Sequence, residues 1–199
     1  FAAAEWLDGL IQRGISPRAV TNFSESEALQ SFKSGQAAFM RNWPYAWAEL
    51  QKNDSQVRDK IGITTMVAQK GDQPAATLGS WGLSLLKGSE NPESTVEAIK
   101  FLTSEESQRY LYSQYGYTPT QKAIFNDQNL LKEHPSLQSI GEALAYARSR
   151  PETPLYAQVS DVLQRKLSGT LTGMTSPKAG MQQAEQSTIQ VLEAAGAAP

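Results

Sequence analysis

The scarcity of β-strand segments is the feature that most restricts the folds open to this chain. Residues 37–40 form a short apolar run, residues 61–67 are rich in β-branched side chains, and residues 83–86 are apolar again. Helical patterns fill most of the remainder, and from Thr118 onward the pattern is almost wholly helical. Because so few short strands do not make a self-sufficient sheet, we expect them to pair with strands outside this chain, which would complete an α/β fold.

Capping signals predict where several of the helices begin. A Ser, Thr or Asn side chain at such a position accepts a hydrogen bond from an early backbone N–H group, and Pro is favoured in the first turn. Four segments have this pattern: Ser24-Glu-Ser-Glu27, Asn91-Pro-Glu93, Thr103-Ser-Glu-Glu106 and Ser176-Pro177. Glycines that follow helical patterns predict helix ends, and they are Gly14, Gly35 and Gly116.

Composition excludes several classes of function. The formal net charge is −2 over 199 residues and there is no long basic stretch, so we expect no binding to nucleic acid. There is no cysteine, which excludes disulfides and thiolate chemistry within the chain. The first residues, from Phe1 to Trp6, have the pattern of a helix interior, with no initiating Met or signal peptide. We therefore expect a fragment whose natural amino-terminal portion is missing.

The sequence lacks the usual constellations of catalysis. Its single histidine, His134, has no Gly-x-Ser-x-Gly nucleophile segment to serve, so we interpret it as a solvated loop residue. No spacing typical of a metal site, a Walker loop or a dinucleotide fingerprint is present, and we expect no metal and no cofactor. Paired carboxylates such as Glu105–Glu106 and Glu25–Glu27 lie at predicted helix starts, where they interact favourably with the helix dipole.

Aromatic residues in turn-forming segments are the most distinctive chemistry of the chain. A pyranose ring has a face of C–H groups that packs on an aromatic ring, and its hydroxyl groups need polar partners. Aromatic residues on turns, with small neighbours that leave room for a ligand, suit this task. They are Trp43, Tyr45 and Trp47 around Pro44, Trp81 between Ser80 and Gly82, and Tyr117 after Gly116.

Each aromatic residue also has a structural interpretation. For Trp81 we favour the ligand over the core, whereas for Trp43 and Tyr45 both interpretations stay open. Trp47 falls on a predicted helix and is assigned to the core, and for Tyr117 a ligand role is the less favoured interpretation. Arg150 precedes Pro151 and should therefore have an extended backbone, but alone it suggests only a surface arginine.

Several motifs in order resemble those of the family 1 extracellular solute-binding proteins. The resemblance covers nearly the whole chain and includes the branch of trehalose- and maltose-binding proteins. The motifs are Phe32-Lys-Ser-Gly-Gln-Ala-Ala-Phe-Met40, Asn42-Trp-Pro-Tyr45, Leu78-Gly-Ser-Trp-Gly82, Asn91-Pro-Glu with Phe101-Leu-Thr-Ser104, Thr118-Pro-Thr120, Arg150-Pro-Glu-Thr-Pro-Leu-Tyr156 and Gly173-Met-Thr-Ser-Pro177.

The resemblance implies a set of ligand-binding residues. In that branch the Trp and Tyr of the W-P-Y turn, the Trp of G-G-W-G and the Arg of R-P contact the sugar. Ser80 stands where the family usually has a second Gly, which would add a hydroxyl or narrow the site. The implied ligand-binding residues are Trp43, Tyr45, Gly79, Ser80, Trp81 and Arg150.

The resemblance also implies an architecture, a function and partners. It predicts a two-lobe, type II periplasmic-binding-protein fold of class α/β, of which this chain would be the helix-rich carboxy-terminal portion. Residues 1–62 and 117–199 would belong to the carboxy-terminal lobe, and residues 63–116 would include a hinge crossing and part of the amino-terminal lobe.

The implied function is the binding of a small carbohydrate outside the cytoplasm and its delivery to a membrane ABC permease, without catalysis. The implied ligands include trehalose, maltose, sucrose and glucosylglycerol, and a lipid anchor would lie in a segment absent here. Two alternatives stay open: a carbohydrate-active enzyme with aromatic subsites, and a helical module whose aromatic residues bind another protein.

Overall fold

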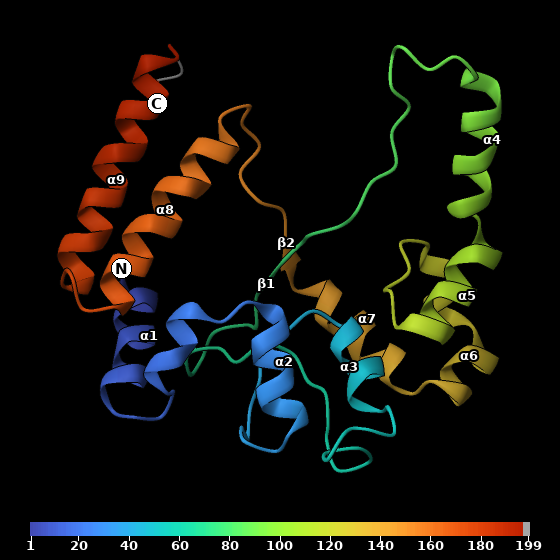
Figure 1. Cartoon of the computed structure of the whole chain (residues 1–199), viewed down its shortest axis with the longest axis horizontal. Coiled ribbons are helices and arrows are strands. Elements are labelled where there is room, and N and C mark those ends of the chain that lie inside the picture. Colours follow the sequence, from blue (N-terminus) through green and yellow to red (C-terminus); the bar gives the residue numbers. More distant parts are fainter. Residues whose placement is uncertain (197–199) are drawn as a thin grey trace. The chain divides into compact units, whose positions relative to one another are not determined.

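The computed structural model describes residues 1–196, and the chain divides into two compact units. Unit 1 consists of Phe1–Ser24 and the described part of Pro151–Pro199, and unit 2 consists of Glu25–Arg150. Figure 1 labels the helices and strands of both units. Every candidate ligand residue of the sequence lies in unit 2.

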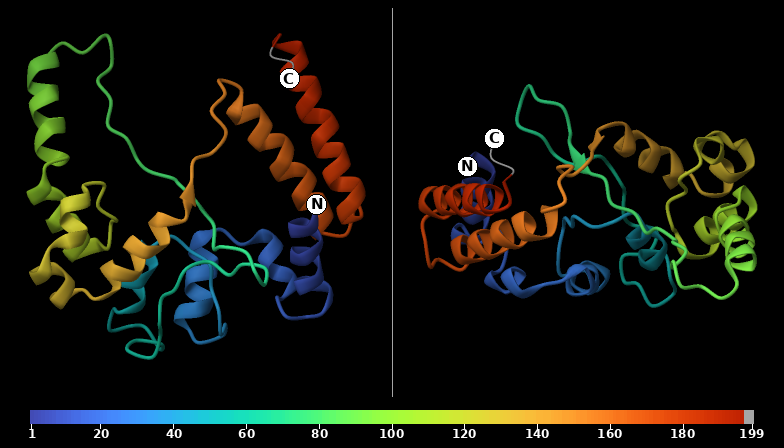
Figure 2. Two further views of the ribbon diagram at one scale, coloured as in Figure 1. Left: turned by 180° about the vertical axis from the view of Figure 1, so that it is seen from behind. Right: turned by 90° about the horizontal axis from the view of Figure 1, so that it is seen from above.

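Unit 1 is built from helices that pack along one another. Its elements are α1 (Ala2–Gln12), the 3₁₀-helix η1 (Arg18–Asn22), α8 (Tyr156–Leu171) and α9 (Pro177–Ala194). Helices α8 and α9 lie side by side in Figures 1 and 2, and α1 contacts both. The Ser176 side chain accepts a hydrogen bond from Ala179 N at 3.3 Å, so this predicted helix start is confirmed.

One close approach fixes how α8 and α9 meet. A Cβ atom built on Gly180 of α9 would stand 2.2 Å from Oγ1 of Thr170 on α8. Thr170 is only 1% exposed, and its Oγ1 donates a hydrogen bond to Lys166 O at 3.0 Å. Because Gly180 has no side chain, the two helices approach more closely than any larger residue would permit.

Unit 2 is also mainly helical, with one very short parallel sheet. Strands β1 and β2 pair in parallel, with Ala76 opposite Ala147 and Thr77 opposite Arg148. The elements of unit 2 are α2 (Glu25–Lys33), α3 (Tyr45–Leu50), β1 (Ala76–Thr77), α4 (Pro92–Leu102), α5 (Glu105–Tyr115), the 3₁₀-helix η2 (Lys122–Asn126), α6 (Gln128–Glu133), α7 (Ser136–Ala145) and β2 (Ala147–Arg148).

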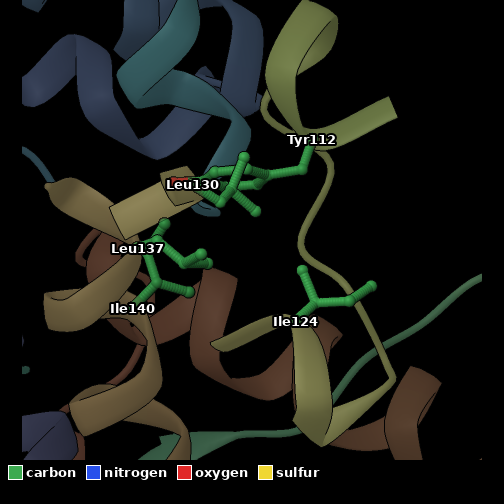
Figure 3. Close-up of a cluster of buried hydrophobic side chains, with 5 residues drawn as sticks. All are labelled: Tyr112, Ile124, Leu130, Leu137 and Ile140. Carbon is green, nitrogen blue, oxygen red and sulfur yellow. The ribbon is translucent and has the colours of Figure 1, made fainter. Parts of the chain in front are cut away.

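The larger hydrophobic cluster of unit 2 joins its later helices. Figure 3 shows its side chains: Tyr112 from α5, Ile124 from η2, Leu130 from α6, and Leu137 and Ile140 from α7. Ile124 and Leu137 are fully buried. Burial of such a side chain contributes roughly 1.5–3 kcal/mol, so this cluster is a main source of stability for the unit.

A second cluster holds α2 against α3. Leu29 of α2 packs with Ala46 and Leu50 of α3, all of them buried. Next to this cluster, the Nζ of Lys33 lies 2.7 Å from a carboxylate oxygen of Asp54, although the Lys33 side chain is only 8% exposed. Asp54 thus compensates the charge of a nearly buried amine.

Local signals predicted the helix limits of unit 2 well. Helix α5 begins one residue later than the predicted capping box, because its cap is Ser104 and not Thr103; the Ser104 Oγ accepts a hydrogen bond from Ser107 N at 3.2 Å. It ends at Gly116, whose φ of 71° is left-handed and favours glycine. Helix α4 begins at Pro92 as expected, but the Asn91 side chain makes no capping hydrogen bond.

The three segments predicted as strands do not form strands within the described chain. Residues 37–40, 61–67 and 83–86 have irregular backbones, and Phe39 in the supposedly buried first segment is 94% exposed. A strand forms only when a neighbour completes its hydrogen-bond ladder, and these segments pair with no other part of the described chain. The side chains of Ile61 and Ile63 nevertheless pack against the two hydrophobic clusters.

No helix within residues 1–196 is both long and apolar enough to span a bilayer.

Candidate functional site

The two short strands of unit 2 bring two distant segments of the chain to the same edge. Gly79 follows the end of β1 by two residues, and Arg150 follows the end of β2 by two residues. Leu78 N donates a hydrogen bond to Arg148 O at 2.8 Å, which continues the pairing beyond the strands. The carboxyl ends of parallel strands are the usual location of ligands in α/β sheets.

Trp43 joins Gly79 and Arg150 at this edge. A Cβ atom on Gly79 would stand 2.7 Å from Cη2 and 3.2 Å from Cζ3 of Trp43, and 3.6 Å from Nη2 of Arg150. Only a residue without a side chain therefore fits between the indole and the guanidinium group. We call Trp43, Gly79 and Arg150 the indole cluster; it combines an aromatic ring, open backbone and a planar set of hydrogen-bond donors.

The opposite end of the Trp43 indole is also held. Its Nε1 donates a hydrogen bond to Oε1 of Glu25, 3.2 Å away. The Asn42 side chain accepts a hydrogen bond from Trp43 N at 2.8 Å and donates one to Glu25 O at 3.1 Å. Trp43 is 37% exposed, so its indole is fixed at both ends and still accessible to a ligand.

Glu25 is held as a carboxylate. A hydrogen bond from its own backbone N–H, the one from Trp43 and the charge of Arg41 lower the pKa of Glu25, against a smaller effect of desolvation. Glu25 is the first residue of α2, where the partial positive charge of the helix end also favours an anion.

Tyr45 lies on the buried side of the same turn. As the first residue of α3 it packs, half-buried, against the cluster formed by Leu29, Ala46 and Leu50. Burial, and then the charges of Glu25 and Glu49, raise the pKa of its phenol. The hydroxyl therefore stays protonated and can donate as well as accept a hydrogen bond.

Ser80 and Trp81 project from the segment that follows Gly79. Both are exposed, and the exposed fraction of Trp81 is 100%. The core interpretation of Trp81 is therefore wrong for the described residues. An indole of this size without contacts is available to cover a ligand next to the indole cluster.

The structure also gives the surroundings of three other residues considered in the sequence. His134 is half-buried against the ring of Tyr112, with ring centroids 5.6 Å apart, so its interpretation as a solvated residue is wrong. Tyr117 is exposed beside Tyr115, and Trp47 is half-buried on α3. Among residues 1–196 no group of three acidic or histidine side chains is arranged to hold a metal ion.

Two residues around Trp43 were not predicted to belong to the site. Glu25 was interpreted only as a helix-start acid, and Asn42 only as part of a motif. The preceding helix start and the W-P-Y turn were both visible in the sequence, but nothing local indicated that they meet.

The comparison with protein families identifies the family of this chain. The profile of the bacterial extracellular solute-binding proteins matches residues 1–109, more than half of the chain. The chain belongs to this family. The membership confirms the resemblance inferred from the ordered motifs.

Individual relatives agree with this assignment. A probable ABC transporter-binding protein of Deinococcus radiodurans is 36% identical over 178 residues, which are 88% of this chain and 42% of that protein. The sn-glycerol-3-phosphate-binding periplasmic protein UgpB of Rhizobium meliloti is 26% identical over 170 residues, 80% of this chain and 39% of that protein. The chain thus spans less than half the length of these relatives.

Solved structures share the fold. Maltose-bound MalE3 of T. maritima has a TM-score of 0.88 at 33% identity, over 95% of this chain and 49% of that one. A solute-binding protein of Agrobacterium radiobacter K84, in complex with ribitol, has a TM-score of 0.71 at 23% identity, over 83% of this chain and 43% of that one. The chain has the helix-rich part of a type II periplasmic-binding-protein fold, which confirms the predicted fold class.

Proposed function

We propose that this protein is the substrate-binding component of an ABC-type sugar importer and binds a disaccharide or a related glycoside or osmolyte. The single observation that carries this proposal is the indole cluster. Trp43, Gly79 and Arg150 come from three distant segments and meet where parallel strands end. An aromatic face and a fork of donors beside open backbone are what a pyranose ring and its oxygens require.

The ligand class follows from the same residues and from the relatives. We place the sugar against Trp43 and Trp81, with Arg150 on its oxygen atoms and Tyr45, Gly79 and Ser80 around it. A structure at 33% identity that contains maltose supports a disaccharide. Trehalose, sucrose and glucosylglycerol share the same chemistry, a ring face and a hydroxyl rim, and belong to the proposed class.

The transport cycle would use two lobes. In this proposal residues 1–62 belong to the carboxy-terminal lobe, and the chain then crosses the hinge into the amino-terminal lobe. Because Tyr112 packs in one hydrophobic cluster with Ile124, Leu130, Leu137 and Ile140, we set the return to the carboxy-terminal lobe after Ile140 and not at residue 117. The last three residues, 197–199, lie outside the described residues. This chain would be the carboxy-terminal portion of the whole protein, and the amino-terminal portion would supply the opposite wall of the cleft. Hinge closure would bury the sugar, and the closed form would dock on the permease outside the cytoplasm.

Calorimetric titration of the protein expressed from its complete gene tests the proposal. Maltose, trehalose, sucrose and glucosylglycerol are the ligands, with sn-glycerol 3-phosphate and ribitol as competitors suggested by the relatives. We expect saturable binding of at least one of the four sugars, with a change in tryptophan fluorescence. Binding of the phosphate ester or ribitol alone would contradict the proposed ligand class.

A separate measurement tests the alternative that the protein is a carbohydrate-active enzyme. Family membership favours binding without catalysis, and one candidate carboxylate, Glu105, is paired with Arg109 at 2.6 Å. We expect each disaccharide to remain intact after prolonged incubation with the protein. Release of a monosaccharide, followed by chromatography, would favour a carbohydrate-active enzyme instead.

A further inference from the structure

We propose that Glu25 is a positioning residue of the sugar site: its carboxylate holds the Trp43 indole in the orientation that the ligand needs. This inference rests on the function proposed above. Glu25 lies outside the aromatic motifs, and it would act on the sugar through the side chain of Trp43.

The Trp43 indole is restrained at two opposite ends. Nε1 belongs to the five-membered ring, whereas Cζ3 and Cη2 form the outer edge of the six-membered ring. Glu25 Oε1 accepts from Nε1 at 3.2 Å, and Gly79 lies against the outer edge. The indole is therefore restrained at both ends, which favours one orientation of its exposed part before any ligand arrives.

Glu25 is itself held in place by its neighbours. It begins α2, its carbonyl accepts a hydrogen bond from the Asn42 side chain at 3.1 Å, and its backbone N–H donates to its carboxylate. Asn42 also binds the backbone of Trp43. The helix start and the turn at Asn42 are therefore joined by two hydrogen bonds, from Asn42 Nδ2 to Glu25 O and from Trp43 Nε1 to Glu25 Oε1, so the position of the indole depends on a rigid element.

The negative charge of Glu25 strengthens its hydrogen bond with Trp43. Arg41, Trp43 and Tyr45 interact with the Glu25 carboxylate. A carboxylate makes a shorter and stronger hydrogen bond with an indole N–H than a neutral acceptor does. Ionised Glu25 therefore restrains Trp43 more firmly than protonated Glu25, which gives this role a spectroscopic signature.

Three variants separate the positioning role from general effects. Glu25→Gln keeps an acceptor oxygen at the same distance, and Glu25→Ala removes it. Glu93→Ala makes the same change at an exposed acid in the first turn of α4, so it controls for the helix-dipole contribution. We expect the affinity for maltose to fall about tenfold in Glu25→Ala and about twofold or less in Glu25→Gln. Glu93→Ala should bind as the wild type does.

The indole N–H resonance of Trp43 provides the second readout. The protein from the complete gene is labelled with ¹⁵N-tryptophan, and the Trp43 indole signal is assigned with a Trp43→Phe variant. We expect the Trp43 signal to move in Glu25→Ala. In the wild type it should also move on acidification, with a midpoint below the ordinary glutamate pKa, and this movement should be absent in Glu25→Gln.

The outcomes distinguish the two proposals. If the wild type binds a sugar but Glu25→Ala binds it equally well, or Glu25→Gln loses as much as Glu25→Ala, the positioning role is wrong and the sugar site stands. If the wild type binds none of the sugars, the proposed function is wrong and the inference falls with it. If Glu25→Ala does not fold, the affinity of Glu25→Gln and the acid titration of the Trp43 signal decide whether Glu25 has the positioning role.

Discussion

The α-carbon of Gly79 lies so close to the outer edge of the Trp43 indole that a Cβ on residue 79 would stand 2.7 Å from Cη2. Real Cβ atoms do not approach an aromatic carbon at this distance, so any side chain at position 79 displaces the ring or the segment. The two residues come from different motifs, and their contact determines where the indole can lie.

Substitution of Gly79 should therefore damage binding more than folding. We expect Gly79→Ala to weaken the affinity for maltose at least tenfold, because the displaced indole no longer lies beside Arg150. Calorimetry measures the affinity and thermal unfolding measures the stability. Gly82→Ala is the matched control, since a Cβ there meets nothing within 4 Å. Equal affinities of the two variants would show that the contact with Trp43 has no role in the site.

Trp81 offers a cleaner test of direct contact with the sugar. Because it is 100% exposed, its replacement removes no packing from the described residues and should leave the unfolding temperature nearly unchanged. We expect Trp81→Ala to weaken sugar binding at least tenfold, about 1.4 kcal/mol. Unchanged affinity with an intact fold would remove Trp81 from the site.

The approach of α8 to α9 predicts a stability effect far from the site residues in sequence. In Gly180→Ala the new methyl group would stand 2.2 Å from Thr170 Oγ1, which is buried. We expect a net loss of about 1–3 kcal/mol in the free energy of unfolding, despite the better helix propensity of alanine. Urea titration monitored by circular dichroism measures it.

Two further variants isolate the cause of that loss. Gly169→Ala changes a glycine of α8 whose Cβ would meet nothing within 4 Å, so it should be neutral or stabilising by up to about 1 kcal/mol. Thr170→Ala, combined with Gly180→Ala, removes the clashing oxygen. A loss of unfolding free energy in the double variant that exceeds the sum of the losses in the two single variants would contradict a steric origin.

The pair formed by Lys33 and Asp54 should make the stability of unit 2 depend on pH. The hydrogen bond from Lys33, and then its charge, lower the pKa of Asp54. A carboxyl group whose pKa is lower in the folded state stabilises the fold above its unfolded pKa, and this contribution is lost as the pH falls through the folded pKa. We expect Asp54→Asn to unfold at a lower temperature than the wild type near pH 7, and the difference to shrink on acidification.

An exposed ion pair provides the control for that series. Lys100 and Glu97 lie 2.7 Å apart with side chains 67% and 71% exposed, so Glu97→Gln should change the unfolding temperature little at any pH. Melting curves of both variants between neutral and acidic pH make the comparison. A difference for Asp54→Asn that persists unchanged in acid would contradict the ionic origin.

Much of the helical structure was predictable because its signals are local. Ser104, Pro92 and Ser176 mark helix starts through groups within one turn, and Gly116 marks a helix end through its own backbone conformation. The predicted strands do not form within the described chain, for the opposite reason. Residues 61–67 have strand composition, but a strand needs a partner, and composition does not supply one.

The sequence by itself determined the helices, the turn around Pro44, and the presence of aromatic residues beside Pro44 and after Gly79. Only the tertiary structure decided that Trp43, Gly79 and Arg150 meet and that Glu25 holds the indole. The physical reason is distance along the chain. Caps and turns depend on neighbours within a few residues, whereas this cluster depends on β1 pairing with β2 and on the turn at Asn42 binding the start of α2.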